Sequence, residues 1–121
     1  MNKTQREMPF LAPVKAPANA PDALVRRIET DEQAIAVSIA ACGLKQSYIA
    51  AAMGRSAPWL SRVRHGSLRL TDEQAVRFCA LTGSNLLRQV RALREALAEI
   101  RGELDAAETI RRYAEELRRA A

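Results

Sequence analysis

The stretch GLKQSYIAAAMGRSAPWLSRVRHGSLRL, residues 43–70, decides the fold. It contains two short helical patterns separated by Gly54, and each pattern carries apolar residues spaced three or four positions apart. These apolar residues are Ile49, Ala50 and Met53 in the first pattern and Leu60 and Val63 in the second. The stretch also holds five basic residues and no acidic residue.

Glycine, serine and proline mark where these two helices begin and end. Gly43 and Gly54 suit the left-handed conformation that ends a helix. Ser56 is a good N-cap, and Pro58 falls in the first turn, where a missing N–H costs little. Gly66 ends the second helix. We therefore expect two short helices set at an angle by a tight turn.

The second helix can be oriented by turning about 100° per residue. With Leu60 and Val63 facing inward, Pro58, Ser61 and Arg62 fall on the opposite side. This outer face consists of short side chains and one long arginine. Such a face can approach a DNA duplex closely, and Arg62 is long enough to reach base edges.

The stretch resembles the helix-turn-helix of phage Cro and repressor proteins, the XRE-like family. The resemblance covers roughly half the chain, from residue 31 to residue 87. The matching residues are Gln46, Ala50, Gly54, Ser56, Leu60, Ser61, Arg62, Val63 and Gly66. The resemblance implies a small all-α bundle of four to five helices, followed here by a long C-terminal helix, and sequence-specific binding to double-stranded DNA.

The resemblance also implies which residues contact DNA. Gln46 would bind a phosphate, and His65 and Ser67, in the loop after the second helix, would touch the DNA backbone. Bases would be read by Ser56, Ala57, Pro58, Ser61 and Arg62. The chain departs from the family at Ala57 and Pro58, where a bidentate amide or a second arginine is common. These two residues offer only apolar contact, for instance to a thymine methyl.

Three larger side chains flank the second helix. We expect Arg55 and Arg64 to contact phosphates, although Arg64 could also be a solvated surface charge. Trp59 lies beside the buried edge, where we expect packing; the alternative is a stacking platform for bases.

Composition supports a binding protein and gives no sign of an enzyme. The formal net charge is +5, which suits a polyanionic partner, and outside residues 43–70 the 14 remaining basic residues balance the 14 acidic ones. There is no nucleophile–base pair, metal-ligand cluster or phosphate-binding glycine loop, so we expect no cofactor and no metal. No export signal or membrane-spanning run appears. Cys42 and Cys79 suit buried thiols in a reducing cytoplasm; the alternative is a disulfide or metal pair.

Two flanking helices begin with the same four residues, TDEQ, at Thr30 and at Thr71. In each, the glutamine can reach back to the threonine amide and form a capping box. The expected buried face of the first helix is Ile35, Ser38, Ile39 and Cys42. The expected buried face of the later helix is Val76, Cys79 and Ala80.

The chain divides into three parts. Residues 1–21 hold four prolines and predict a disordered arm, either inert or following DNA through Lys3, Arg6 and Lys15. We expect residues 22–83 to form the DNA-binding domain. Residues 22–29 would lead into it as one or two helical turns. Residues 84–121 form a C-terminal helical segment for oligomerisation.

The C-terminal segment carries a stripe with the alternating 4,3 spacing of a coiled coil. The stripe consists of Leu86, Val90, Leu93, Leu97, Ile100 and Leu104. It resumes out of step at Ile110, Tyr113 and Leu117, so we expect a kink or break within residues 102–107. Outer ion pairs are expected between Arg101 and Asp105, Glu108 and Arg112, and Glu115 and Arg119. We expect the stripe to mediate self-association as a dimer or tetramer; the alternative is that it folds back onto the domain.

Taken together, these patterns predict a cytoplasmic transcriptional regulator of phage or mobile-element type. It would bind DNA as an oligomer and block or recruit RNA polymerase. The alternative is an antitoxin-like interaction protein, whose C-terminal helix binds a protein partner. A third option is an adaptor that uses the same fold without DNA.

Overall fold

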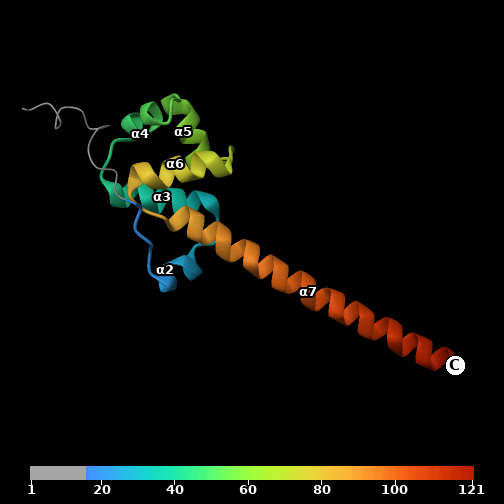
Figure 1. Cartoon of the computed structure of the whole chain (residues 1–121). Coiled ribbons are helices and arrows are strands. Elements are labelled where there is room, and N and C mark those ends of the chain that lie inside the picture. The colour runs from blue at the N-terminus through green and yellow to red at the C-terminus, as the bar shows by residue number, and fades with distance from the viewer. Residues whose placement is uncertain (1–15) are drawn as a thin grey trace, which may run out of the picture. The chain divides into compact units, whose positions relative to one another are not determined.

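The computed structural model describes residues 16–121, and within them the protein is all-helical. The expected small helical bundle followed by a long C-terminal helix is confirmed (Figure 1). The helices are α2 (Asp22–Arg27), α3 (Asp31–Cys42), α4 (Gln46–Ala52), α5 (Ala57–Arg64), α6 (Asp72–Thr82) and α7 (Leu86–Ala120). No single helix in this part of the chain is long and apolar enough to cross a bilayer; only α3 and α4 together, bent by 109°, reach that length and composition.

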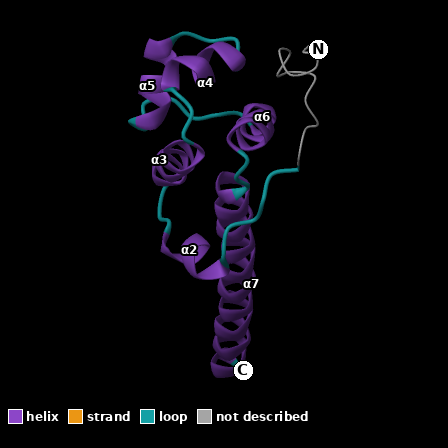
Figure 2. Ribbon diagram, turned by 90° about the vertical axis from the view of Figure 1, so that its left-hand side faces the viewer, coloured by secondary structure: helices purple, strands orange, loops and turns teal. Residues whose placement is uncertain are grey.

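The chain forms two structural units, of which the first ends at Val90 and the second is the remainder of α7. The core of the first unit collects apolar side chains from all six helices, including the first turns of α7. Figure 2 shows α3 and α6 end-on, and α5 packs against both α3 and α4. The largest fully buried side chains are Phe78, Ile35, Ile49, Leu60, Leu70, Leu86, Leu87 and Val63.

The turn between α4 and α5 has the predicted geometry. Gly54 has a φ of 73°, and the next amide, that of Arg55, donates to the carbonyl of Ala50 at 2.8 Å. This bond caps α4 and reverses the chain. Ser56 then caps α5, because its hydroxyl oxygen accepts a hydrogen bond from the backbone N–H of Trp59 at 3.4 Å.

Both predicted capping boxes are present. The hydroxyl of Thr30 accepts from the Gln33 N–H, and the hydroxyl of Thr71 accepts from the Gln74 N–H. Each glutamine side chain accepts in return from the threonine N–H, so two unpaired donors at each helix start are satisfied.

The predicted buried face of α6 was correct at Cys79, which is fully buried, and wrong at Val76 and Ala80. Val76 is exposed by 45%, and Ala80 is also exposed. The buried residues of α6 are Ala75, Phe78, Cys79 and Thr82. These follow i, i+3, i+4, i+7 spacing, and burying the large Phe78 ring outweighs burying Val76. The α3 prediction was closer: Ile35, Ser38 and Ile39 are buried, and Cys42 is half-buried.

A short strap of backbone, residues 18–20, pairs with the connection between α6 and α7. The N–H of Ala18 donates to the Gly83 carbonyl at 2.9 Å, and the carbonyl of Ala18 accepts from the Asn85 N–H at 2.8 Å. The Gln89 carboxamide pairs with both backbone groups of Ala20, at 2.8 and 3.1 Å. The end of the predicted arm is therefore hydrogen-bonded to the domain, whereas Lys3, Arg6 and Lys15 lie outside the described residues.

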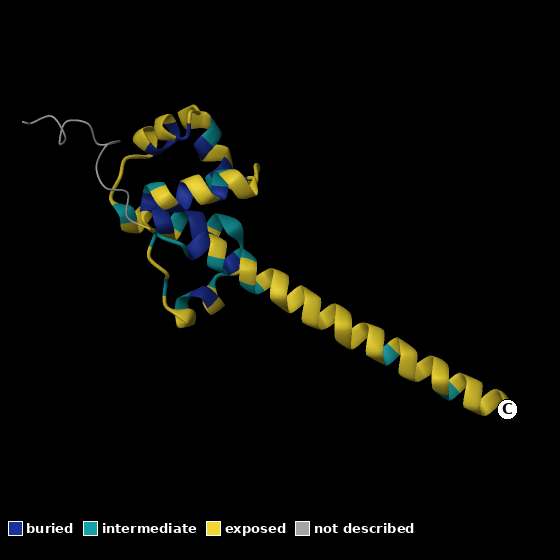
Figure 3. Ribbon diagram, in the orientation of Figure 1, coloured by how far each residue is buried: buried dark blue, intermediate teal, exposed yellow. Residues whose placement is uncertain are grey.

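Helix α7 runs without interruption from Leu86 to Ala120, so the expected break near Gly102 does not occur. The predicted Glu108–Arg112 pair is present at 3.3 Å. Glu115 pairs with Arg111 at 2.8 Å instead of with Arg119, and Arg111 also binds Glu108. Figure 3 shows that most residues of the second unit are exposed.

Gly54→Ala tests the turn between the two helices. We expect the variant to lose about 1–2 kcal/mol of unfolding free energy, because an L-residue is strained at positive φ. Space is not the cause, since a Cβ at Gly54 would meet no atom within 4 Å. The measurement is urea denaturation of the full chain.

Gly102→Ala is the matched control, because Gly102 also has open space around its Cα but lies within α7. There alanine should raise helix stability by about 0.5–1 kcal/mol. Equal changes in unfolding free energy for the two substitutions would contradict the left-handed conformation of Gly54 in the turn.

Candidate nucleic-acid interface

The ten residues predicted to bind DNA all lie between the start of α4 and the loop after α5. Nine of them are exposed, and Arg64 is half-buried. The exposed nine are Gln46, Arg55, Ser56, Ala57, Pro58, Ser61, Arg62, His65 and Ser67. Because α4 and α5 pack directly against each other, these residues belong to one contiguous pair of helices.

Helix α5 has the orientation that its sequence predicts. Leu60 and Val63 are each 1% exposed and anchor the helix in the core. Pro58, Ser61 and Arg62 are exposed. The Arg62 guanidinium has no hydrogen-bond or ion-pair partner among residues 16–121, so all its donors are available to a ligand.

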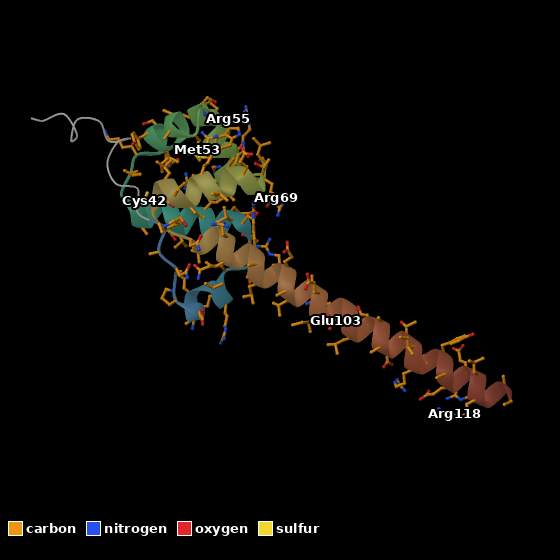
Figure 4. The ribbon with its side chains drawn as sticks, in the orientation of Figure 1. Cys42, Met53, Arg55, Arg69, Glu103 and Arg118 are labelled. Carbon is orange, nitrogen blue, oxygen red and sulfur yellow. The ribbon has the colours of Figure 1, made fainter. Side chains whose placement is uncertain are left out.

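The five basic side chains of the acid-free stretch differ in how they are engaged. Arg62 and Lys45 have no ion-pair partner within the described chain. The Arg55 guanidinium lies 5.5 Å from the centroid of the half-buried Trp59 ring, a cation–π contact. Arg69 pairs with Asp31 at 3.4 Å, and Arg64 donates to Gln46 at 3.2 Å. Figure 4 marks Arg55 and Arg69 on the domain.

Two acidic residues at the start of α3 lie closer to this surface than the sequence indicates. The Asp31 carboxylate, 14% exposed, binds Arg69. The Glu32 carboxylate lies over Gly66, where an added Cβ would collide with it. Asp31 and Glu32 lie in the first turn of α3, where acidic residues suit the helix dipole without any tertiary neighbour, so the sequence gives no signal for this proximity. Arg69 is therefore partly neutralised, and the remaining positive charge comes from α5, from the turn before it and from the residue that precedes α4.

The loop after α5 is held by backbone bonds to that helix. The N–H of Ser67 donates to the Arg62 carbonyl at 2.9 Å. The His65 ring places Nδ1 2.7 Å from the Ser61 carbonyl oxygen. A carbonyl can only accept, so Nδ1 carries the hydrogen, and in the neutral ring Nε2 has only a lone pair. His65 can thus offer a second donor only when its ring is charged.

The predicted oligomerisation stripe is divided between two environments. Leu86 and Val90 are 0% and 3% exposed and belong to the core of the first unit, so they are not available to a second copy. Leu93 is half-buried. Leu97, Ile100 and Leu104 are 49%, 53% and 66% exposed. Only this later part of the stripe is an apolar surface in the single chain.

No family model, curated protein or solved structure matches the chain. The likeness to XRE-like proteins therefore rests on the residues quoted above.

Proposed function

We propose that this protein is a sequence-specific, double-stranded-DNA-binding transcriptional regulator of phage or mobile-element type. Helix α5 would enter the major groove, and Ser61 and Arg62 would provide most of the base readout. Lys45, Gln46 and Arg55 would set its position through backbone phosphates. The bound protein would act in the cytoplasm by blocking or recruiting RNA polymerase.

One observation carries the proposal: the outer face of α5 is exposed, free of acidic residues, and centred on an unpaired arginine. Its neighbours on that face, Pro58 and Ser61, are short, so the helix backbone can approach a duplex. An unpaired arginine supplies the two parallel donors that match guanine O6 and N7. Selection of bound fragments from random duplex DNA tests the proposal and would reveal the operator.

The substitution Arg62→Ala should distinguish a contact between Arg62 and a base from a contact between Arg62 and a phosphate. We expect a loss of about 1–3 kcal/mol at the selected site and relaxed specificity at one base pair. The measurement is affinity for the selected site and for each single-base variant of it. An equal loss on every sequence would mean that Arg62 contacts phosphate only.

Arg55→Ala is the comparison variant. It should weaken binding to all sequences alike. The slope of log affinity against log salt should become smaller by about 0.9, because binding then releases one counterion fewer. An unchanged slope would exclude Arg55 from the interface. Trp59, the only tryptophan, lies next to Arg55 and supplies an intrinsic fluorescence signal for the same titration.

We further propose that the protein binds DNA as a homodimer or homotetramer joined through α7. Leu97, Ile100 and Leu104 follow the 3,4 spacing of a coiled coil and expose apolar surface in a single chain. A helix with such a surface gains stability when a second helix covers it. Two recognition helices would also double the contacts and match a twofold-symmetric site.

Ile100→Glu tests this self-association. We expect the variant to sediment as a monomer and to bind DNA more weakly, because a buried carboxylate opposes helix pairing. The thermal unfolding of the first unit should not change, since Ile100 is 53% exposed. Ala98→Glu, at an exposed position away from the stripe, should stay oligomeric. A monomeric wild-type protein at micromolar concentration would exclude self-association.

The same exposed stripe also favours the second candidate, an antitoxin-like protein whose α7 binds a different protein. The two candidates differ in what covers Leu97, Ile100 and Leu104. A purified chain that is already dimeric or tetrameric favours the regulator, whereas a monomer favours the antitoxin-like protein.

A further inference from the structure

Gln46 and Arg64 form a side-chain pair across the two helices of the candidate interface. Gln46 is the first residue of α4, and Arg64 is the last residue of α5. The Arg64 Nη1 donates to the Gln46 Oε1 at 3.2 Å. Neither side chain makes another hydrogen bond within residues 16–121, and the Arg64 Nε is buried without a partner.

This bond determines which end of the Gln46 carboxamide faces outward. A guanidinium can only donate, so it must meet the amide oxygen, and the amide NH₂ then points away from Arg64. Gln46 is exposed and its NH₂ group has no partner in the described part of the chain. Two donors are thereby presented to solvent. Without Arg64 the amide could turn over and present its oxygen, which a phosphate would repel.

The sequence of α5 explains why Arg64 reaches α4. Ala57, Ser61 and Arg64 are spaced four and three residues apart and share one face of the helix. Long side chains on a helix lean toward its N-terminus, and Ala57 and Ser61 are too small to block that path. Arg64 therefore lies half-buried against α4. Its exposure differs from that of Arg62, which is free in solvent.

We propose that Arg64 is a positioning residue, which holds the Gln46 carboxamide with its NH₂ group toward a DNA phosphate. Arg64 itself does not contact the phosphate in this arrangement. The inference rests on the proposed binding of duplex DNA at this face. It replaces the sequence-based expectation that Arg64 is one more backbone contact.

A double-mutant cycle on the full chain tests the proposal. The variants are Arg64→Met, which keeps the aliphatic stem but removes the donors, Gln46→Ala, and the two combined. The probe is a labelled duplex of random sequence, because a phosphate contact does not depend on sequence. Affinity is measured at several salt concentrations, and thermal unfolding is followed for every variant.

We expect each single variant to bind about threefold to tenfold more weakly, the effect of losing one hydrogen bond. The double variant should bind no more weakly than the weaker single variant, because both substitutions remove the same contact. The salt slope of Arg64→Met should equal that of the wild type. Arg55→Ala, measured alongside, should lower the slope by about 0.9.

Gln46→Glu adds a test that does not depend on removing any side chain. The carboxylate can still accept from Arg64, so thermal stability should be kept. It presents an oxygen to the phosphate in place of NH₂, so the affinity should fall further than in Gln46→Ala.

Several results would overturn the role of Arg64 while leaving DNA binding intact. Additive losses in the double variant, or a reduced salt slope in Arg64→Met, would make Arg64 a direct phosphate contact. Wild-type affinity of Arg64→Met would remove it from the interface. If the wild-type protein binds no duplex even at low salt, the proposed function fails, which is a different outcome from these.

Discussion

The burial of Leu60 and Val63 is the constraint on which the candidate interface depends. Both side chains are 1% exposed, and they fix the rotation of α5 about its own axis. Since residues in a helix are about 100° apart, this rotation leaves Ser61 and Arg62 facing solvent. The turn at Gly54 fixes the direction of α5 relative to α4. Two apolar contacts and one left-handed residue thus determine which chemistry the surface offers.

The helix-turn-helix could be predicted from the sequence because its signals are local. The Ser56 cap, the glycine turns and the spacing of Leu60 and Val63 each act within one or two helical turns, and the structure reproduces all of them. The face of α6 was predicted less well. Val76 and Phe78 are both apolar, and which one is buried depends on the space left by other helices.

Longer-range features gave no sequence signal. The strap at residues 18–20 is held mostly by backbone groups, which every residue has, so a prediction from side-chain character missed it. The ion pair between Asp31 and Arg69 also gave no signal, because an acidic residue in the first turn of α3 is already explained by the helix dipole. At the candidate interface, counting 100° per residue predicted which side of α5 is exposed. It could not distinguish Arg62, which has no partner in the described chain, from Arg64, which is hydrogen-bonded to Gln46.

Helix α7 illustrates why a periodic stripe does not identify its partner. Leu86 and Val90 continue the same apolar spacing as Leu97 and Ile100, yet these two residues are in the domain core. Starting a helix is unfavourable, and extending one costs little, so packing of the first turns supports the helical residues that follow. The exposed part of α7 is then already helical before any partner arrives. Self-association would need to order few residues, so most of the free energy from covering Leu97, Ile100 and Leu104 would remain as binding affinity.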